Sequence, residues 1–83
     1  MNIIFGAGSN GHNYLKKTKA KINYFVDNDK NLWNKKISSI KCLNPLNLKK
    51  LKFKKIIIAS PAIENIKSQL KGLKIDSKKI QVS

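Results

Sequence analysis

The glycine-rich stretch near the N-terminus is the part of the sequence best suited to chemistry. It has the spacing G-x-G-x-x-G and consists of Gly6, Ala7, Gly8, Ser9, Asn10 and Gly11. In such a loop the first glycine permits a tight turn, the second lets the backbone approach a diphosphate, and the third lets a helix lie close to a strand. The N–H groups at the start of that helix attract anions. The stretch therefore predicts a loop that holds a phosphate-bearing ligand.

An acidic residue follows at the distance expected of a partner for this loop. Asp27 comes 21 residues after Gly6, at the end of the strand-like stretch 22–26, and Asn28 stands beside it. At that place a carboxylate accepts hydrogen bonds from the two hydroxyls of a ribose. A second interpretation stays open, in which the glycines form only a turn and Asp27 only an Asx turn.

Two more polar side chains lie where they could contact the same ligand. His12 follows the last glycine, where it would touch a phosphate, act as a base, or stay exposed in the first helical turn. A P-loop needs Lys at this position, so that motif is excluded. Ser60 follows the apolar run 55–59, and it either lines the ligand crevice or caps the next helix.

The chain alternates between strand-like and helix-like stretches. Apolar and β-branched runs predict strands at residues 3–5, 22–26, 40–42, 55–59 and 79–82. Capping signals and apolar spacing predict helical segments at residues 11–20, 45–51 and 63–73. Such alternation requires crossover connections and a parallel sheet. We therefore expect a single α/β domain over residues 1–83, with strand order 3-2-1-4-5 and helices on both faces.

Length and charge narrow the classes of protein further. The 83 residues include 18 lysines, no arginine and four acidic residues, which gives a net charge of +14. Because arginine is the residue suited to bidentate phosphate contacts, its absence favours a coding bias over a nucleic-acid-binding patch. One cysteine and one histidine exclude a disulfide scaffold and a Cys/His zinc cluster.

The apolar runs are too short for a membrane span. The longest is Ile56-Ile57-Ile58-Ala59, whereas a spanning helix needs about 20 apolar residues. The N-terminus also lacks the charged and apolar regions of a signal peptide. A soluble, cytoplasmic location is the expectation.

Three segments together resemble a known kind of domain: Ile3 through Gly11, Tyr24-Phe25-Val26-Asp27-Asn28-Asp29, and Ile56-Ile57-Ile58-Ala59-Ser60. They are similar to the Rossmann-like N-terminal domain of bacterial polysaccharide-biosynthesis enzymes, both nucleotide-sugar 4,6-dehydratases of the capsule type and sugar acyltransferases with a left-handed β-helix. The resemblance covers nearly the whole chain. It implies that residues 6–11 and Asp27 hold NAD or a nucleotide-sugar, and that Ser60 lines the far side.

The same resemblance implies that this domain binds the nucleotide and that another part carries out catalysis. The catalytic parts of those enzymes lie outside the matching region, and this sequence shows no Ser/His/Asp set, paired carboxylates or Tyr-x-x-x-Lys dyad. The expected function is therefore nucleotide binding, as a module of a sugar-processing enzyme with a separate catalytic domain or subunit as partner. Three alternatives stay open: a basic nucleic-acid-binding protein, a methyltransferase-like domain that binds S-adenosylmethionine, and a remnant of the fold that binds nothing.

Overall fold

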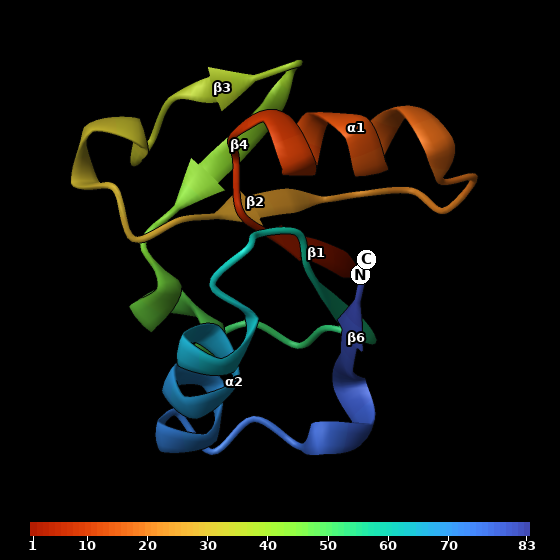
Figure 1. The fold of residues 1–83 in the computed structure, drawn as a ribbon. Coiled ribbons are helices and arrows are strands. Elements are labelled where there is room, and N and C mark those ends of the chain that lie inside the picture. The colour runs from red at the N-terminus through yellow and green to blue at the C-terminus, as the bar shows by residue number, and fades with distance from the viewer.

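The computed structural model describes residues 1–83 as one α/β domain built around a six-stranded sheet (Figure 1). The order of the strands across the sheet is β3-β4-β2-β1-β5-β6. Their bounds are Asn2–Phe5 for β1, Tyr24–Val26 for β2, Lys36–Ile37 for β3, Ile40–Leu43 for β4, Lys55–Ile58 for β5 and Ile80–Val82 for β6. Five of the strands are parallel, and β3 runs antiparallel to β4 at one border.

The first strand of the chain lies in the middle of the sheet. Strand β1 pairs with β2 on one side and with β5 on the other, so that Ile4 stands opposite both Phe25 and Ile57. A strand in this position is buried on both faces, which explains why its residues are apolar without alternation. The loops that follow β1, β2 and β5 consequently meet at one border of the sheet.

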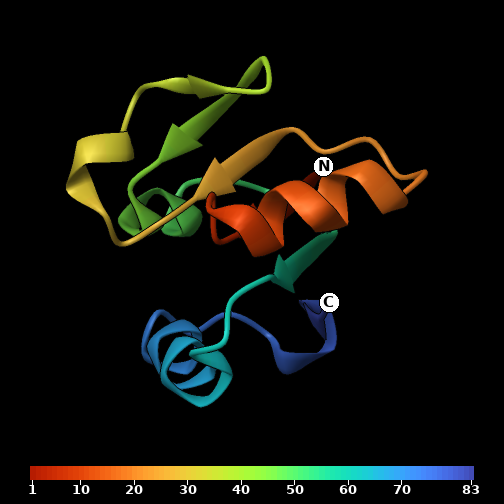
Figure 2. The ribbon, with the colours of Figure 1, turned by 45° about the horizontal axis from the view of Figure 1, so that its top comes forward.

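Two helices cover the two faces. Helix α1 spans Ser9–Lys17 and α2 spans Ile63–Gly72, and the views in Figures 1 and 2 place them on opposite sides of the sheet. Tyr14 and Leu15 of α1 pack on a core cluster that contains Ile4 and Phe25. The second cluster joins Ile66 and Leu70 of α2 to residues of β1, β2 and β5 whose side chains point to the other face.

Three short 3-10 segments make up the remaining helical structure. They are η1 at Lys30–Leu32, η2 at Pro45–Lys49 and η3 at Ser77–Lys79. Each begins after an Asp or Asn whose side chain accepts a hydrogen bond from a backbone N–H: Asp29 from Asn31, Asn44 from Leu46 and Asp76 from Lys78. These caps satisfy donors that a short helical turn leaves unpaired.

The expected architecture is confirmed, with one addition. The five expected strands stand in the expected order, and helices cover both faces. The addition is β3, which forms a hairpin with β4 through Ser38 (φ 50°) and Ser39 (φ 67°). Helix α1 also starts two residues earlier than expected, at Ser9, which puts Gly11 inside the helix.

No helix of the chain is both long enough and apolar enough to cross a membrane.

Candidate functional site

The carboxyl edge of the sheet, formed by the residues that follow β1, β2 and β5, gathers most of the polar residues singled out in the sequence. Backbone hydrogen bonds extend the sheet into this edge: Gly6 N–H donates to the carbonyl of Val26 at 2.8 Å, and Ala59 N–H donates to the carbonyl of Phe5 at 2.9 Å. The glycine loop is thereby held between the ends of its two neighbouring strands.

Two of the loop glycines are required by the fold itself. Gly6 has φ +120°, a conformation that residues with a Cβ rarely adopt, and a Cβ there would collide with the carbonyl oxygen of Ala59. A Cβ on Gly11 would collide with the carbonyl oxygen of Gly6 and would lie 3.3 Å from the Phe25 ring. The turn and the close approach of α1 to β1 therefore account for both residues without any ligand.

Gly8 is different, because nothing in the protein requires a glycine there. Its φ of −86° and ψ of −155° are open to any residue, and a Cβ would meet no atom within 4 Å. Gly8 is the N-cap of α1 and has no capping side chain, and the first turn contains no acidic residue. The first N–H group to donate within the helix is that of His12, which donates to the Gly8 carbonyl at 3.0 Å. The N–H groups of Ser9, Asn10 and Gly11 therefore remain available for an anion.

Two cavities open side by side at this edge. One, of about 260 Å³, is here called the Asn28 cavity, and the other, of about 250 Å³, the Gly8 cavity. Gly6, Asp27 and Ser60 line both of them. The remaining lining residues are Phe5, Asn28, Ala62, Asn65, Ile66 and Gln69 for the Asn28 cavity, and Gly8, Ser9, Asn10, Ala59 and Pro61 for the Gly8 cavity. A ligand that spans the edge would thus pass over Asp27.

Asp27 ties the glycine loop to the loop after β2. Its Oδ2 accepts a hydrogen bond from Ala7 N–H at 2.9 Å, and its Oδ1 accepts one from Asp29 N–H, also at 2.9 Å. The second bond is the Asx turn that the sequence left open as an alternative. Each carboxylate oxygen can accept a further hydrogen bond, because a carboxylate has about four acceptor sites. The turn is therefore compatible with a ribose at the same oxygens.

A pair of amide side chains joins the two sides of the Asn28 cavity. Asn28 Nδ2 donates to Gln69 Oε1 at 2.9 Å, and Gln69 Nε2 donates to Asn28 Oδ1 at 2.8 Å. The pair links the loop after β2 to helix α2. Gln69 and its neighbour Asn65, one helical turn earlier, escaped the sequence analysis; their i, i+4 spacing beside the apolar stripe of α2 was the available signal.

The other two candidates differ in where they lie. Ser60 lines both cavities, and its Oγ also accepts a hydrogen bond from Ala62 N–H at 3.1 Å, so lining and capping occur together. His12 lines neither cavity. Its Nδ1 is 2.8 Å from the Gly8 carbonyl oxygen, and its ring lies against Phe25 with a centroid distance of 6.0 Å. Of the candidates, only Ala7, Gly11 and His12 line neither cavity.

Trp33 and Cys42 lie close to the loop that carries Asp27. Trp33 Nε1 donates to the carbonyl of Asp27 at 2.7 Å, which fixes the loop that carries this acid. Burial, with smaller contributions from the negative charges of Asp27 and Asp29, raises the pKa of the Cys42 thiol to about 11. No group of three or more His, Cys, Asp or Glu residues is arranged to hold a metal ion.

Comparison with solved structures shows the same fold in proteins of distant sequence. UDP-D-quinovosamine 4-dehydrogenase from Vibrio fischeri matches with a TM-score of 0.71 at 21% identity, over 98% of this chain and 73% of that one. RSP, solved with β-NAD⁺ and operator DNA, matches with a TM-score of 0.69 at 15% identity, over 99% and 48%. Another RSP structure, described as a Rex-family repressor, gives 0.66 at 15% identity, over 99% and 51%.

The extent of these matches differs from one relative to the next. The chain spans about half the length of the RSP chains and about three quarters of the dehydrogenase chain. A search of curated proteins by sequence finds no match. The sequence does match a family of domains over residues 2–81, nearly its full length. Its glycine loop lies at the carboxyl edge of a Rossmann-like sheet. Because the match covers nearly the whole sequence, the chain belongs to the C2185-like, N-terminal family.

Proposed function

We propose that the carboxyl edge binds a nucleotide-containing small molecule, either NAD or a nucleotide-sugar. The diphosphate would lie in the Gly8 cavity against the N-terminus of α1, and a ribose would lie over Asp27. The observation that carries the proposal is the environment of Gly8. The fold has room for a side chain at this position, but such a side chain would stand between the helix N-terminus and an approaching anion.

The chemistry of the two cavities agrees with this placement. The Gly8 cavity offers backbone N–H groups and no acidic side chain other than Asp27, which stands at its border with the Asn28 cavity. The Asn28 cavity adds an amide pair that can donate and accept at once, as the edge of a base requires. Two proteins with this fold support the ligand class: one is a UDP-D-quinovosamine 4-dehydrogenase, and the other, RSP, was solved with β-NAD⁺.

The finer proposal concerns the role of the domain. We infer that it serves as the nucleotide-binding module of a sugar- or polysaccharide-processing system, with catalysis supplied by another domain or subunit. The residues at the edge support this, since they offer hydrogen-bond donors and acceptors but no nucleophile paired with a base. His12, the only histidine, is turned toward Phe25 rather than into either cavity.

A titration of the intact chain tests the ligand class. NAD, NADP, UDP-glucose, S-adenosylmethionine and a short RNA are added separately, and thermal shift and calorimetry record binding. We expect NAD or UDP-glucose to raise the melting temperature at millimolar concentration. Absence of any nucleotide effect at that concentration overturns the proposal. RNA binding that weakens steeply with salt, without nucleotide binding, favours the nucleic-acid alternative.

The variant Gly8→Ala tests where the ligand lies. Its fold should be as stable as that of the wild type, because the added Cβ meets no protein atom within 4 Å. Its affinity for the ligand should fall at least about fivefold, since an added methyl at a tight contact costs about 1–3 kcal/mol. Gly72→Ala is the matched control, because its Cβ also meets nothing but lies far along the chain in α2. Equal affinities in the two variants would show that the diphosphate does not lie at Gly8.

A further inference from the structure

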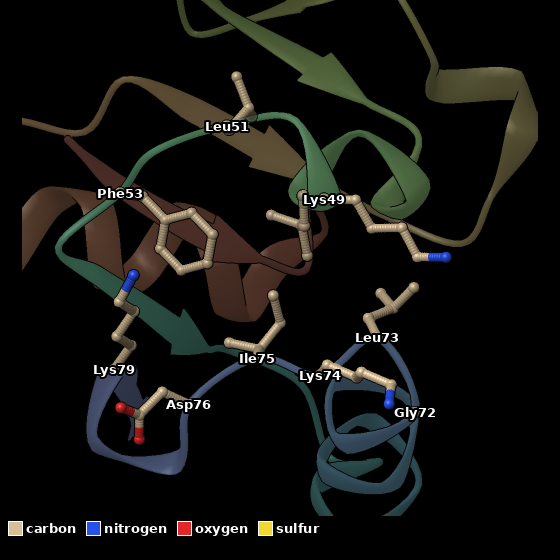
Figure 3. A pocket seen from close by; sticks show the side chains of 10 residues that line it. Lys49, Leu51, Phe53, Gly72, Leu73, Lys74, Ile75, Asp76 and Lys79 are labelled. Carbon is tan, nitrogen blue, oxygen red and sulfur yellow. The ribbon is translucent and has the colours of Figure 1, made fainter.

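A third cavity lies at the opposite edge of the sheet. It has a volume of about 480 Å³ and is bounded by the segment that precedes β5 and the segment that precedes β6 (Figure 3). Because these strands are parallel, both segments belong to the amino edge, opposite the glycine loop. We call this space the amino-edge cavity. We propose that it binds a small amphipathic carboxylate, with an apolar body inside and its single negative charge at Lys79.

The walls of the amino-edge cavity suit an apolar body. Leu48 and Phe53 belong to the buried core, and Leu51, Leu73 and Ile75 pack against that core as partly buried side chains. The volume falls within the range of about 300–1,000 Å³ that is usual for small-molecule sites. Figure 3 shows Phe53 and Ile75 facing the same space from the two segments.

Lys79 sets this cavity apart from the rest of the lysine-rich surface. Sixteen of the 18 lysines are exposed, and only Lys55 and Lys79 are half-buried. The Lys79 ammonium lies 5.2 Å from the centre of the Phe53 ring, and Figure 3 shows it pointing toward that ring. The single ion pair of the protein joins Lys67 to Glu64, so Lys79 has no carboxylate partner.

The acidic residue in the cavity wall does not neutralise this ammonium. Asp76 Oδ1 accepts a hydrogen bond from Lys78 N–H at 2.9 Å, which caps η3. Lys49 and Lys74 also line the cavity, and both are exposed. Three ammonium groups against one carboxylate leave the cavity with an excess of positive charge, which favours an anion.

The neighbouring helix end limits the kind of anion. The cavity lies at the C-terminus of α2, where Leu73, Lys74 and Ile75 donate their backbone N–H groups to the last carbonyls of the helix. These three N–H groups are therefore not available to a phosphate, in contrast to those at the start of α1. The partial negative charge of a helix C-terminus also disfavours a multiply charged group. A single carboxylate held by Lys79 fits this site better than a nucleotide does.

The test uses octanoate as the probe and the intact chain. Backbone amide resonances are followed during titration with octanoate, octanol and octylammonium. We expect octanoate to bind at about millimolar concentration, as its size allows, and to shift the amides of Leu73, Ile75 and Lys79. Octylammonium should bind more weakly than octanoate. No binding, or shifts confined to residues 6–11, overturns the proposal and leaves the nucleotide site untouched.

Two lysine variants separate the site from the general charge of the protein. Lys79→Gln should weaken octanoate binding about fivefold, the effect of losing an ion pair worth about 1 kcal/mol. Lys78→Gln changes the net charge equally at an exposed neighbour that does not line the cavity, and it should change affinity less than about twofold. Lys79→Arg should restore binding. Equal losses for the Gln variants would mean that only the overall charge attracts the anion, which contradicts the proposal.

Discussion

The two edges of the sheet are built from the same strands but offer opposite chemistry. The carboxyl edge has two cavities of about 260 and 250 Å³, lined by glycines, a carboxylate and amides. The amino-edge cavity has a volume of about 480 Å³, with apolar walls and three lysines. It is larger than either cavity at the carboxyl edge, yet those two suit the proposed nucleotide better. Backbone N–H groups and a polar acceptor therefore indicate a candidate nucleotide site better than cavity volume does.

Helix direction explains the difference. Helix α1 starts at the carboxyl edge and α2 ends at the amino edge, so the first presents N–H groups and the second presents carbonyls. At the amino edge those carbonyls are already satisfied by the residues that follow the helix. The carboxyl edge therefore has unused hydrogen-bonding capacity, whereas the amino edge has unused charge and apolar surface.

The largest effect is expected for Gly11→Ala. The added Cβ would press on the carbonyl of Gly6 and separate α1 from β1, at a cost of about 3 kcal/mol in the free energy of unfolding. Urea denaturation followed by circular dichroism measures this cost. Gly72→Ala, at the amino edge, should be neutral or stabilising by up to about 1 kcal/mol. If both variants are equally stable, α1 does not lie as close to the end of β1 as the structure shows.

The next comparison pairs one aspartate from each edge. Asp27→Ala removes two hydrogen bonds to backbone N–H groups and should cost about 2 kcal/mol of unfolding free energy. Asp76→Ala removes one and should cost about 1 kcal/mol. The same denaturation experiment measures both. A smaller cost for Asp27→Ala than for Asp76→Ala would show that Asp27 does not hold the glycine loop.

A smaller effect, of opposite sign, is expected at the amino edge. Lys74 follows α2 with φ 63°, a left-handed conformation that favours glycine. Lys74→Gly should therefore raise the free energy of unfolding by about 0.5 kcal/mol, after allowing for the greater freedom of glycine in the unfolded chain. Lys71→Gly, inside α2, should instead lower it by about 1 kcal/mol. Thermal melts of the two variants should shift in opposite directions.

A last comparison concerns the pH dependence of stability. The pKa of Cys42 rises from 9.0 to about 11 in the folded chain, because the thiol is buried and lies near the acids of the carboxyl edge. Between these values the unfolded chain releases the thiol proton and the folded chain keeps it, so stability falls as pH rises.

Denaturation of the wild type and of Cys42→Ala is measured at several pH values between about 8 and 10.5. Lysines begin to titrate in this range in both proteins, so the difference between the two profiles isolates the thiol. The loss of unfolding free energy over this range should be steeper for the wild type than for Cys42→Ala, since only the wild type has the thiol. Parallel profiles would show that Cys42 ionises equally in both states.

Much of the fold followed from local sequence signals. Long apolar runs marked β1 and β5, and the glycine spacing marked the turn that joins β1 to α1. The hairpin of β3 and β4 was missed because its turn uses Ser38 and Ser39 in left-handed conformations, where Asn-Gly is the usual signal. Helix α2 ends at Gly72, within one residue of the expected bound, and Lys74 adopts the left-handed conformation after it.

The loops of the candidate site could be predicted from the sequence, but the contact between the loop after β2 and helix α2 could not. Gly8, Asp27 and Ser60 were found because each lies in a loop that follows a strand, and parallel strands bring such loops to one edge. The partner of Asn28, Gln69, lies far along the chain on a helix face, and only the packing of α2 brings the two amides together. His12 was placed near the ligand by its position in the chain, whereas its ring packs on Phe25.

The central position of β1 has a consequence for the order in which the domain forms. During synthesis β1 leaves the ribosome before the other strands of the sheet, yet its second neighbour, β5, begins only at Lys55. Until β5 arrives, one side of β1 has no pairing partner, and the glycine loop lacks the strand end that confines it. Only the β3–β4 hairpin can close from nearby residues. The proposed ligand site should therefore assemble late, at the slow rate of folds dominated by contacts between distant segments.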